Sequence, residues 1–134
     1  MKTSIVNTYH LRFVNIEIYG EKWKHCSISN SKSQTTLGCF LSCWQRINKI
    51  DRLLRDIDDL ILGDSTDIAT GCDAVLIDVY KEKTEFYDIS AKQTFNTPDL
   101  IIPTLDFKAI LKEWRRFLEM PAVFDYKDKL IKVA

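Results

Sequence analysis

One amphipathic pattern constrains the fold of this 134-residue chain more than any other feature. Between Gly38 and Leu62, apolar residues recur at alternating steps of three and four: Phe40, Cys43, Ile47, Ile50, Leu54, Ile57 and Ile61. This spacing follows the 3.6-residue period of an α-helix and gathers the apolar side chains on one face. Three more apolar residues widen that face beyond the narrow seam of a coiled coil: Trp44, Leu53 and Leu60. We therefore predict one helix over residues 38–62, lying on a sheet and capped by Gly63.

Alternating apolar residues on both sides of this helix predict β-strands. The expected strands span residues 11–19, 23–29, 74–80 and 84–90, with a short one at 100–102. Turns at 20–21 and 81–83 would join the longer strands into two hairpins. Apolar residues of the first strand fall on both parities, which indicates either a bulge or burial of both faces. The polar stretches 29–36 and 64–71 are expected to be loops, and the weakly alternating segment 123–133 an edge strand or a surface segment.

A second amphipathic helix is expected after Thr104, which suits the N-cap, and before Pro121. The expected order is therefore ββαββα. Two hairpins separated by helices favour an α+β fold, with an antiparallel or mixed sheet of four to six strands and two amphipathic helices packed on it. Residues 1–134 are expected to form a single domain, because two domains of half this length would each be marginally stable.

Cysteine use and the lack of targeting signals bear on the compartment. The first ten residues contain no apolar run of signal-peptide length, and no apolar stretch is long enough to span a bilayer. We therefore expect a cytoplasmic protein with reduced, mostly buried thiols, Cys43 packing within the helix stripe. A zinc site of Cys39, Cys43, Cys72 and His25 is an alternative, but neither a CxxC pair nor a His pair supports it, and no metal is expected.

Motifs for catalysis are missing from the sequence. It has no GxGxxG, Walker-type or GxSxG motif, and its Asp-rich stretch does not match EF-hand spacing. His10 has no identifiable partner, and His25 and Cys26 would point to opposite faces of a strand. We therefore expect that the protein has no cofactor and no enzymatic activity. The alternative is a small enzyme that depends on Asp and His.

The charge distribution is uneven although the formal net charge is zero. Residues 51–78 contain eight Asp against two Arg. Carboxylates near a helix C-terminus oppose the helix dipole, so stability alone does not select them. We predict that this acidic block binds a basic partner, with two aromatic residues near the first turn as further anchors. The predicted partner-binding residues are Asp56, Asp58, Asp59, Asp64, Asp67, Tyr19 and Trp23.

The second half of the sequence resembles a known family. The features that carry the resemblance are the hairpin at 74–80 and 84–90, the short strand ending at Pro103, Phe107 entering a helix, and Trp114 followed by Phe117 and Leu118. These features resemble small immunity proteins of bacterial polymorphic-toxin and contact-dependent growth inhibition systems. The resemblance implies an inhibitor that neutralises a cognate toxin domain, such as a nuclease, in a heterodimer.

Other functions remain open at this point. One is a regulatory or structural subunit that self-associates as a homodimer through the first helix. Direct nucleic-acid binding is not expected, because the net charge is zero, and neither is membrane binding.

Overall fold

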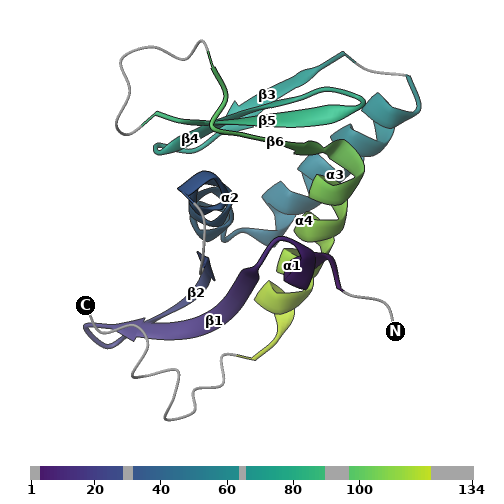
Figure 1. Ribbon diagram of the computed structural model, residues 1–134. Helices are drawn as coiled ribbons and strands as arrows, with labels where there is room; N and C mark the ends of the chain where they lie inside the picture. The colour runs from purple at the N-terminus through teal and green to yellow at the C-terminus, as the bar shows by residue number, and fades with distance from the viewer. Residues whose placement is uncertain (1–3, 29–31, 64–65, 90–96, 122–134) are drawn as a thin grey trace.

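Helices α2, α3 and α4 lie between a two-stranded sheet and a four-stranded sheet (Figure 1). The computed structural model describes residues 4–28, 32–63, 66–89 and 97–121. Within those residues the elements are α1 (Ile5–Thr8), β1 (Leu11–Ile18), β2 (Glu21–Ile28), α2 (Lys32–Cys43), α3 (Ile47–Ile61), β3 (Ile68–Gly71), β4 (Val75–Val79), β5 (Lys83–Asp88), β6 (Leu100–Pro103) and α4 (Thr104–Glu119).

Strands β1 and β2 form an antiparallel hairpin with an unbroken register from Leu11 opposite Ile28 to Ile18 opposite Glu21. Tyr19 and Gly20 form its turn with φ values of 50° and 81°. Positive φ at both central residues matches the right-handed twist of a two-residue hairpin. Because the register has no bulge, the mixed parity of apolar residues in β1 reflects burial of both faces, one of the two predicted outcomes.

The second sheet has the order β3-β4-β5-β6 with every neighbouring pair antiparallel. Its inner face is apolar and covered by the helices. The buried residues of that face are Val75, Ile77, Val79, Thr84, Phe86 and Ile102. Phe40 of α2 and Phe107 of α4 both pack on Phe86, with ring centroids 6.0 and 5.3 Å away. The hairpin joins the same core, because the Phe13 ring lies 5.1 Å from the buried Trp114.

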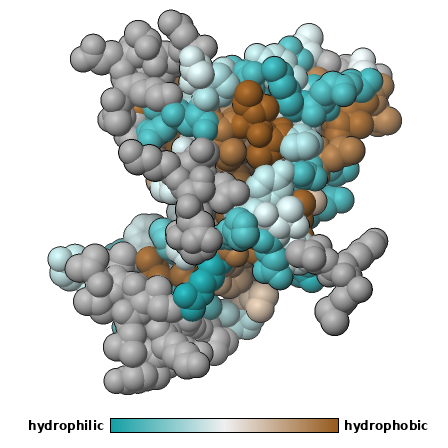
Figure 2. Space-filling view, in the orientation of Figure 1, coloured by the Kyte–Doolittle hydropathy of each residue, from teal (hydrophilic) through white to brown (hydrophobic). Residues whose placement is uncertain are grey.

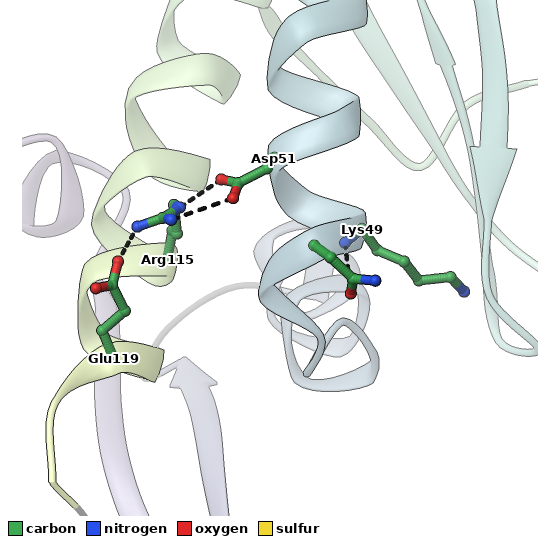
Figure 3. A network of polar contacts seen from close by, with 5 residues as sticks. Lys49, Asp51, Arg115 and Glu119 are labelled. Atoms are coloured by element: carbon green, nitrogen blue, oxygen red, sulfur yellow. Dashed lines mark hydrogen bonds and ion pairs between the residues drawn. The ribbon is translucent and has the colours of Figure 1, made fainter.

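Ion pairs hold α3 against α4 on their outer sides. Arg115 of α4 lies between Asp51 of α3 and Glu119 of its own helix (Figure 3). Its Nη2 donates to Asp51 Oδ2 at 3.1 Å, and its Nε contacts the other carboxylate oxygen. Nearer the other end of the pair, Lys108 Nζ lies 2.5 Å from Asp58 Oδ1.

The α+β class is confirmed, but the prediction of one helix over 38–62 is wrong. The helix breaks at residues 44–46, because tertiary contacts satisfy the polar groups there. The Trp44 carbonyl accepts Trp114 Nε1–H at 2.8 Å, and the Trp44 indole donates to Gly71 O at 3.2 Å. Gln45 Nε2 donates to Ser42 O and Lys24 O, both at 2.8 Å. The break contains neither Gly nor Pro, so local sequence gives no sign of it.

Several smaller predictions also differ from the structure. Helix α2 begins at Lys32, inside the expected loop 29–36, and β3 forms inside the expected loop 64–71. With the short helix α1 these elements replace the order ββαββα, and the strands form two sheets rather than one. Thr104 does not cap α4, because its buried hydroxyl donates to Tyr80 O and meets Thr84 Oγ1. Gly63 follows the end of α3 with φ 85°, as predicted. The segment 123–133 lies outside the described residues.

Candidate functional site

The outer face of the four-stranded sheet carries a mixture of apolar and acidic side chains. Strand alternation directs every second residue away from the helices. We call these residues the outer sheet face: Ala69, Leu76, Asp78, Glu85, Tyr87 and Ile101. Figure 2 shows hydrophobic patches interrupted by hydrophilic residues in the part of the molecule where Figure 1 draws this sheet.

Two carboxylates occupy directly opposed positions on this face. Asp78 of β4 is the register partner of Glu85 of β5. Like charges directly opposite each other destabilise an antiparallel pair, so sheet stability does not explain this choice. Glu85 is kept ionised by its neighbours. Tyr87 Oη donates to Glu85 Oε1 at 2.8 Å and Lys83 Nζ lies 3.0 Å from Oε2, and these contacts lower the pKa of Glu85.

The raised pKa of Tyr80 reflects the negative potential of nearby carboxylates at one end of the face. The carboxylate of Asp78 raises the pKa of Tyr80, and so do partial burial, Glu85 and Asp67, whereas Lys83 lowers it. Asp67 immediately precedes the edge strand β3, so it extends the acidic region beyond the Asp78–Glu85 pair. A cationic group placed here would meet several carboxylates at once.

Apolar surface flanks the carboxylates. Leu76 is 42% exposed beside Tyr87 on the neighbouring strand, and Ile101 is 51% exposed opposite Glu85. An open depression of about 270 Å³ runs over β3, β4 and β5, with Ala69, Leu76 and Tyr87 in its lining. Exposed aliphatic and aromatic groups with charges between them are typical of surfaces that bind other macromolecules.

The Asp residues of the predicted acidic block that the structure describes do not form one surface. Asp56 and Asp59 are exposed on α3, whereas Asp58 pairs with Lys108 and so contributes to the packing of α3 on α4. Asp67 belongs to the edge of the outer sheet face. Asp64 lies outside the described residues.

The two predicted aromatic anchors lie on the β1–β2 hairpin and not on the outer sheet face. Tyr19 is fully exposed at the tip of the β1–β2 hairpin, and Trp23 on β2 is 45% exposed. Figure 1 places this hairpin at the opposite end of the molecule from the four-stranded sheet. A surface confined to the outer sheet face therefore does not include Tyr19 or Trp23, although Trp23 lines an open pocket with Gly71 at the end of β3.

The apolar stripe that a self-associating subunit would use is turned inward. Four residues of α3 are buried in the core: Ile50, Leu53, Ile57 and Leu60. A homodimer through the first predicted helix would have to use the polar side of α3 instead.

His25 contacts a serine rather than a thiol. Ser42 Oγ of α2 lies 3.2 Å from His25 Nδ1 and accepts the Cys26 N–H at 2.9 Å, which ties α2 to β2. Burial lowers the pKa of His25. His25 and Ser42 line an open pocket of about 410 Å³, and Cys39 and Cys43 are also in its lining. Within the described residues, no group of three or more His, Cys, Asp or Glu side chains is arranged to hold a metal ion.

The thiols differ from the sequence prediction. Cys26 is buried, Cys72 is half-buried, and Cys39 and Cys43 are exposed. The prediction that Cys43 packs in the core is wrong because α2 ends at this residue and turns Leu37, Phe40 and Leu41 inward instead.

Sequence reasoning missed Asp78 and Glu85 as a pair, although the signal was present. Asp78 has the opposite parity from Val75, Ile77 and Val79 of its strand, and Glu85 lies between Thr84 and Phe86. A hairpin that pairs Val79 with Thr84 places Asp78 opposite Glu85. The register of the hairpin, rather than the charge count of the segment, locates the site.

Comparisons with protein-family models, with curated proteins and with solved structures gave no match. Among the residues that the structure describes, no helix combines the length and the apolar character needed to cross a bilayer.

Proposed function

We propose that this protein is a non-catalytic inhibitor that binds a partner protein through its outer sheet face. The observation that carries the proposal is the opposition of Asp78 and Glu85, flanked by exposed Leu76 and Ile101. Like charges directly opposite each other are generally unfavourable within a sheet, and they become favourable when a cationic surface is placed against them.

The chemistry of the face favours a basic partner surface. An enzyme that acts on nucleic acid holds phosphates with Lys and Arg, so its active site is positively charged. A guanidinium or ammonium group can approach the carboxylates while its aliphatic stem packs on Leu76 or Ile101. This supports the role that the resemblance implied, an immunity protein in a heterodimer with a toxin domain, and we propose the cytoplasm as its site of action.

Co-expression with the neighbouring gene tests the function. The protein encoded next to this chain is expressed in bacteria with and without it, and growth and nuclease activity are measured. The proposal predicts growth arrest by the neighbour alone, rescue by the wild-type chain, and loss of rescue by Asp78→Lys. Asp59→Lys, which makes the same charge change on α3, should still rescue growth.

The possible results of this experiment test the inhibitor role and the assigned binding surface separately. A neighbour that leaves growth unaffected would contradict the inhibitor proposal. Rescue by Asp78→Lys but not by Asp59→Lys would support an inhibitor but contradict the outer sheet face as its binding surface. The binding surface would then be the acidic side of α3.

A further inference from the structure

Two cysteines that are distant in sequence meet at the end of α2. Cys43 is the last residue of this helix, and Cys72 follows the last residue of β3. Both line one open pocket of about 710 Å³. The residues beside them are hydrogen-bonded, since Trp44 Nε1 donates to Gly71 O at 3.2 Å. The Cys43 thiol itself is hydrogen-bonded to Cys72.

The backbone around Cys72 is held in one conformation. The Cys72 N–H donates to Val75 O at 2.8 Å. Gly71 has φ 156°, and a Cβ atom at this position would lie 2.3 Å from Val75 O, so only glycine fits. The backbone position of Cys72 is therefore fixed by a hydrogen bond and by a turn that requires glycine at residue 71.

Both sulfurs can be reached by a reagent from solvent. Cys43 is exposed and Cys72 is half-buried, whereas Cys26 is buried in the core. Cys39 lies one helical turn before Cys43 on α2. It is therefore the other exposed thiol that could form a bond with Cys72 in place of Cys43.

We propose that Cys43 and Cys72 form a reversible disulfide by exchange with a low-molecular-weight disulfide such as glutathione disulfide. One protein thiolate attacks the reagent and displaces one glutathione thiolate, which leaves a mixed disulfide. The second protein thiolate attacks the protein sulfur of that bond and displaces the other glutathione. Two protein thiols and one glutathione disulfide become one protein disulfide and two glutathione thiols, and the protein is oxidised by two electrons.

The bond would fasten the end of α2 to the β3–β4 connection. It closes a loop that contains the helix break and α3, so it restricts the unfolded chain. Partial desolvation of the sulfur and the hydrogen bond with Cys72 raise the pKa of Cys43 to about 12. Because the thiolate is the reactive form, we expect exchange to speed up as the pH rises. This inference goes beyond the proposed function and does not depend on it.

Mass spectrometry of the full chain in glutathione redox buffers tests the proposal. After acid quenching and alkylation, the oxidised protein should lack two hydrogens and carry no glutathione. A non-reducing tryptic digest should link the peptide 33–46 to the peptide 56–81. Because peptide 33–46 contains both Cys39 and Cys43, the variants Cys39→Ser and Cys43→Ser are needed to assign the bond.

Each outcome is decisive for the thiol pair. The proposal predicts that the cross-link persists in Cys39→Ser, is lost in Cys43→Ser and Cys72→Ser, and raises the Tm of the wild-type chain by several degrees. A cross-link that survives Cys43→Ser would assign the bond to Cys39 and overturn the proposal. Glutathione adducts without any protein cross-link would overturn it as well. Unchanged circular dichroism of the exposed-site variants provides the folding control.

Discussion

Asp78 on β4 lies directly opposite Glu85 on β5, on the sheet face that the helices leave uncovered. Glu85 is hydrogen-bonded to Tyr87 and paired with Lys83, so its charge is retained. The two strands thus hold like charges together although an apolar or oppositely charged pair would fit the same positions. Such a local conflict with stability is expected where a surface is selected for binding.

The first prediction concerns the stability of the free protein. Asp78→Lys should raise the free energy of unfolding by about 0.2–1 kcal/mol, because it replaces a cross-strand repulsion with an attraction to Glu85. Urea unfolding monitored by tryptophan fluorescence measures the change. Asp59→Lys on the exposed side of α3 is the matched control and should change stability by less than about 0.5 kcal/mol. A clear loss of stability in Asp78→Lys would contradict the repulsion.

The second prediction concerns the hydroxyl pair under the sheet. Thr104 Oγ1 donates to Tyr80 O at 2.5 Å and lies 3.0 Å from Thr84 Oγ1, with both threonines buried. Thr104→Val should cost about 1–3 kcal/mol of unfolding free energy, because it leaves buried acceptors without this donor. The double variant Thr84→Val/Thr104→Val should lose less than the sum of the single losses. Strict additivity would show that the two hydroxyls act independently.

The third prediction concerns the break between α2 and α3. Trp114→Phe removes the donor to the Trp44 carbonyl and leaves space in the core, so it should cost about 2–4 kcal/mol of unfolding free energy. Chemical denaturation gives the value. Trp23→Phe, at a residue 45% exposed, should change stability by less than about 0.5 kcal/mol. Equal effects of the two substitutions would mean that the hydrogen bond and its burial do not hold the break in place.

The fourth prediction concerns pH. The hydrogen bond and charge of Arg115 lower the pKa of Asp51. A depressed folded-state pKa stabilises the protein above the ordinary pKa of Asp, and this contribution is lost as the pH falls through the folded value. NMR titration of the side-chain carboxyl should find the Asp51 pKa raised in Arg115→Met. Lys108→Met, which removes the partner of Asp58 instead, should leave the Asp51 titration unchanged.

The periodic spacing of apolar residues predicted most of the helices and strands, because burial of one face of an element determines that spacing. The strands at 75–79 and 83–88 and the helix ending before Pro121 follow directly from alternating or helical spacing. The break at Trp44 could not be read in this way. It depends on Trp114 and Gly71, which are remote in sequence, and the polar groups of 44–46 are satisfied only in the folded protein.

The candidate site was harder to predict than the fold. Counting charges identified an acidic segment but joined residues that the fold separates. Asp58 contributes to helix packing through Lys108, and Asp67 lies at the sheet edge. Tyr19 and Trp23 belong to the β1–β2 hairpin and not to the four-stranded sheet. Only strand register decides that Asp78 meets Glu85, and a shift by one residue would have placed the two carboxylates on opposite faces of the sheet.

Titration of the protein encoded by the neighbouring gene, which we propose to be the partner, against the wild-type chain, Asp78→Lys and Asp59→Lys tests the proposed binding surface. Calorimetry at physiological salt should give a dissociation constant weakened about 10- to 100-fold by Asp78→Lys, and changed by less than about 3-fold by Asp59→Lys. Unweakened binding by a folded Asp78→Lys variant would contradict the assignment of the outer sheet face as the binding surface.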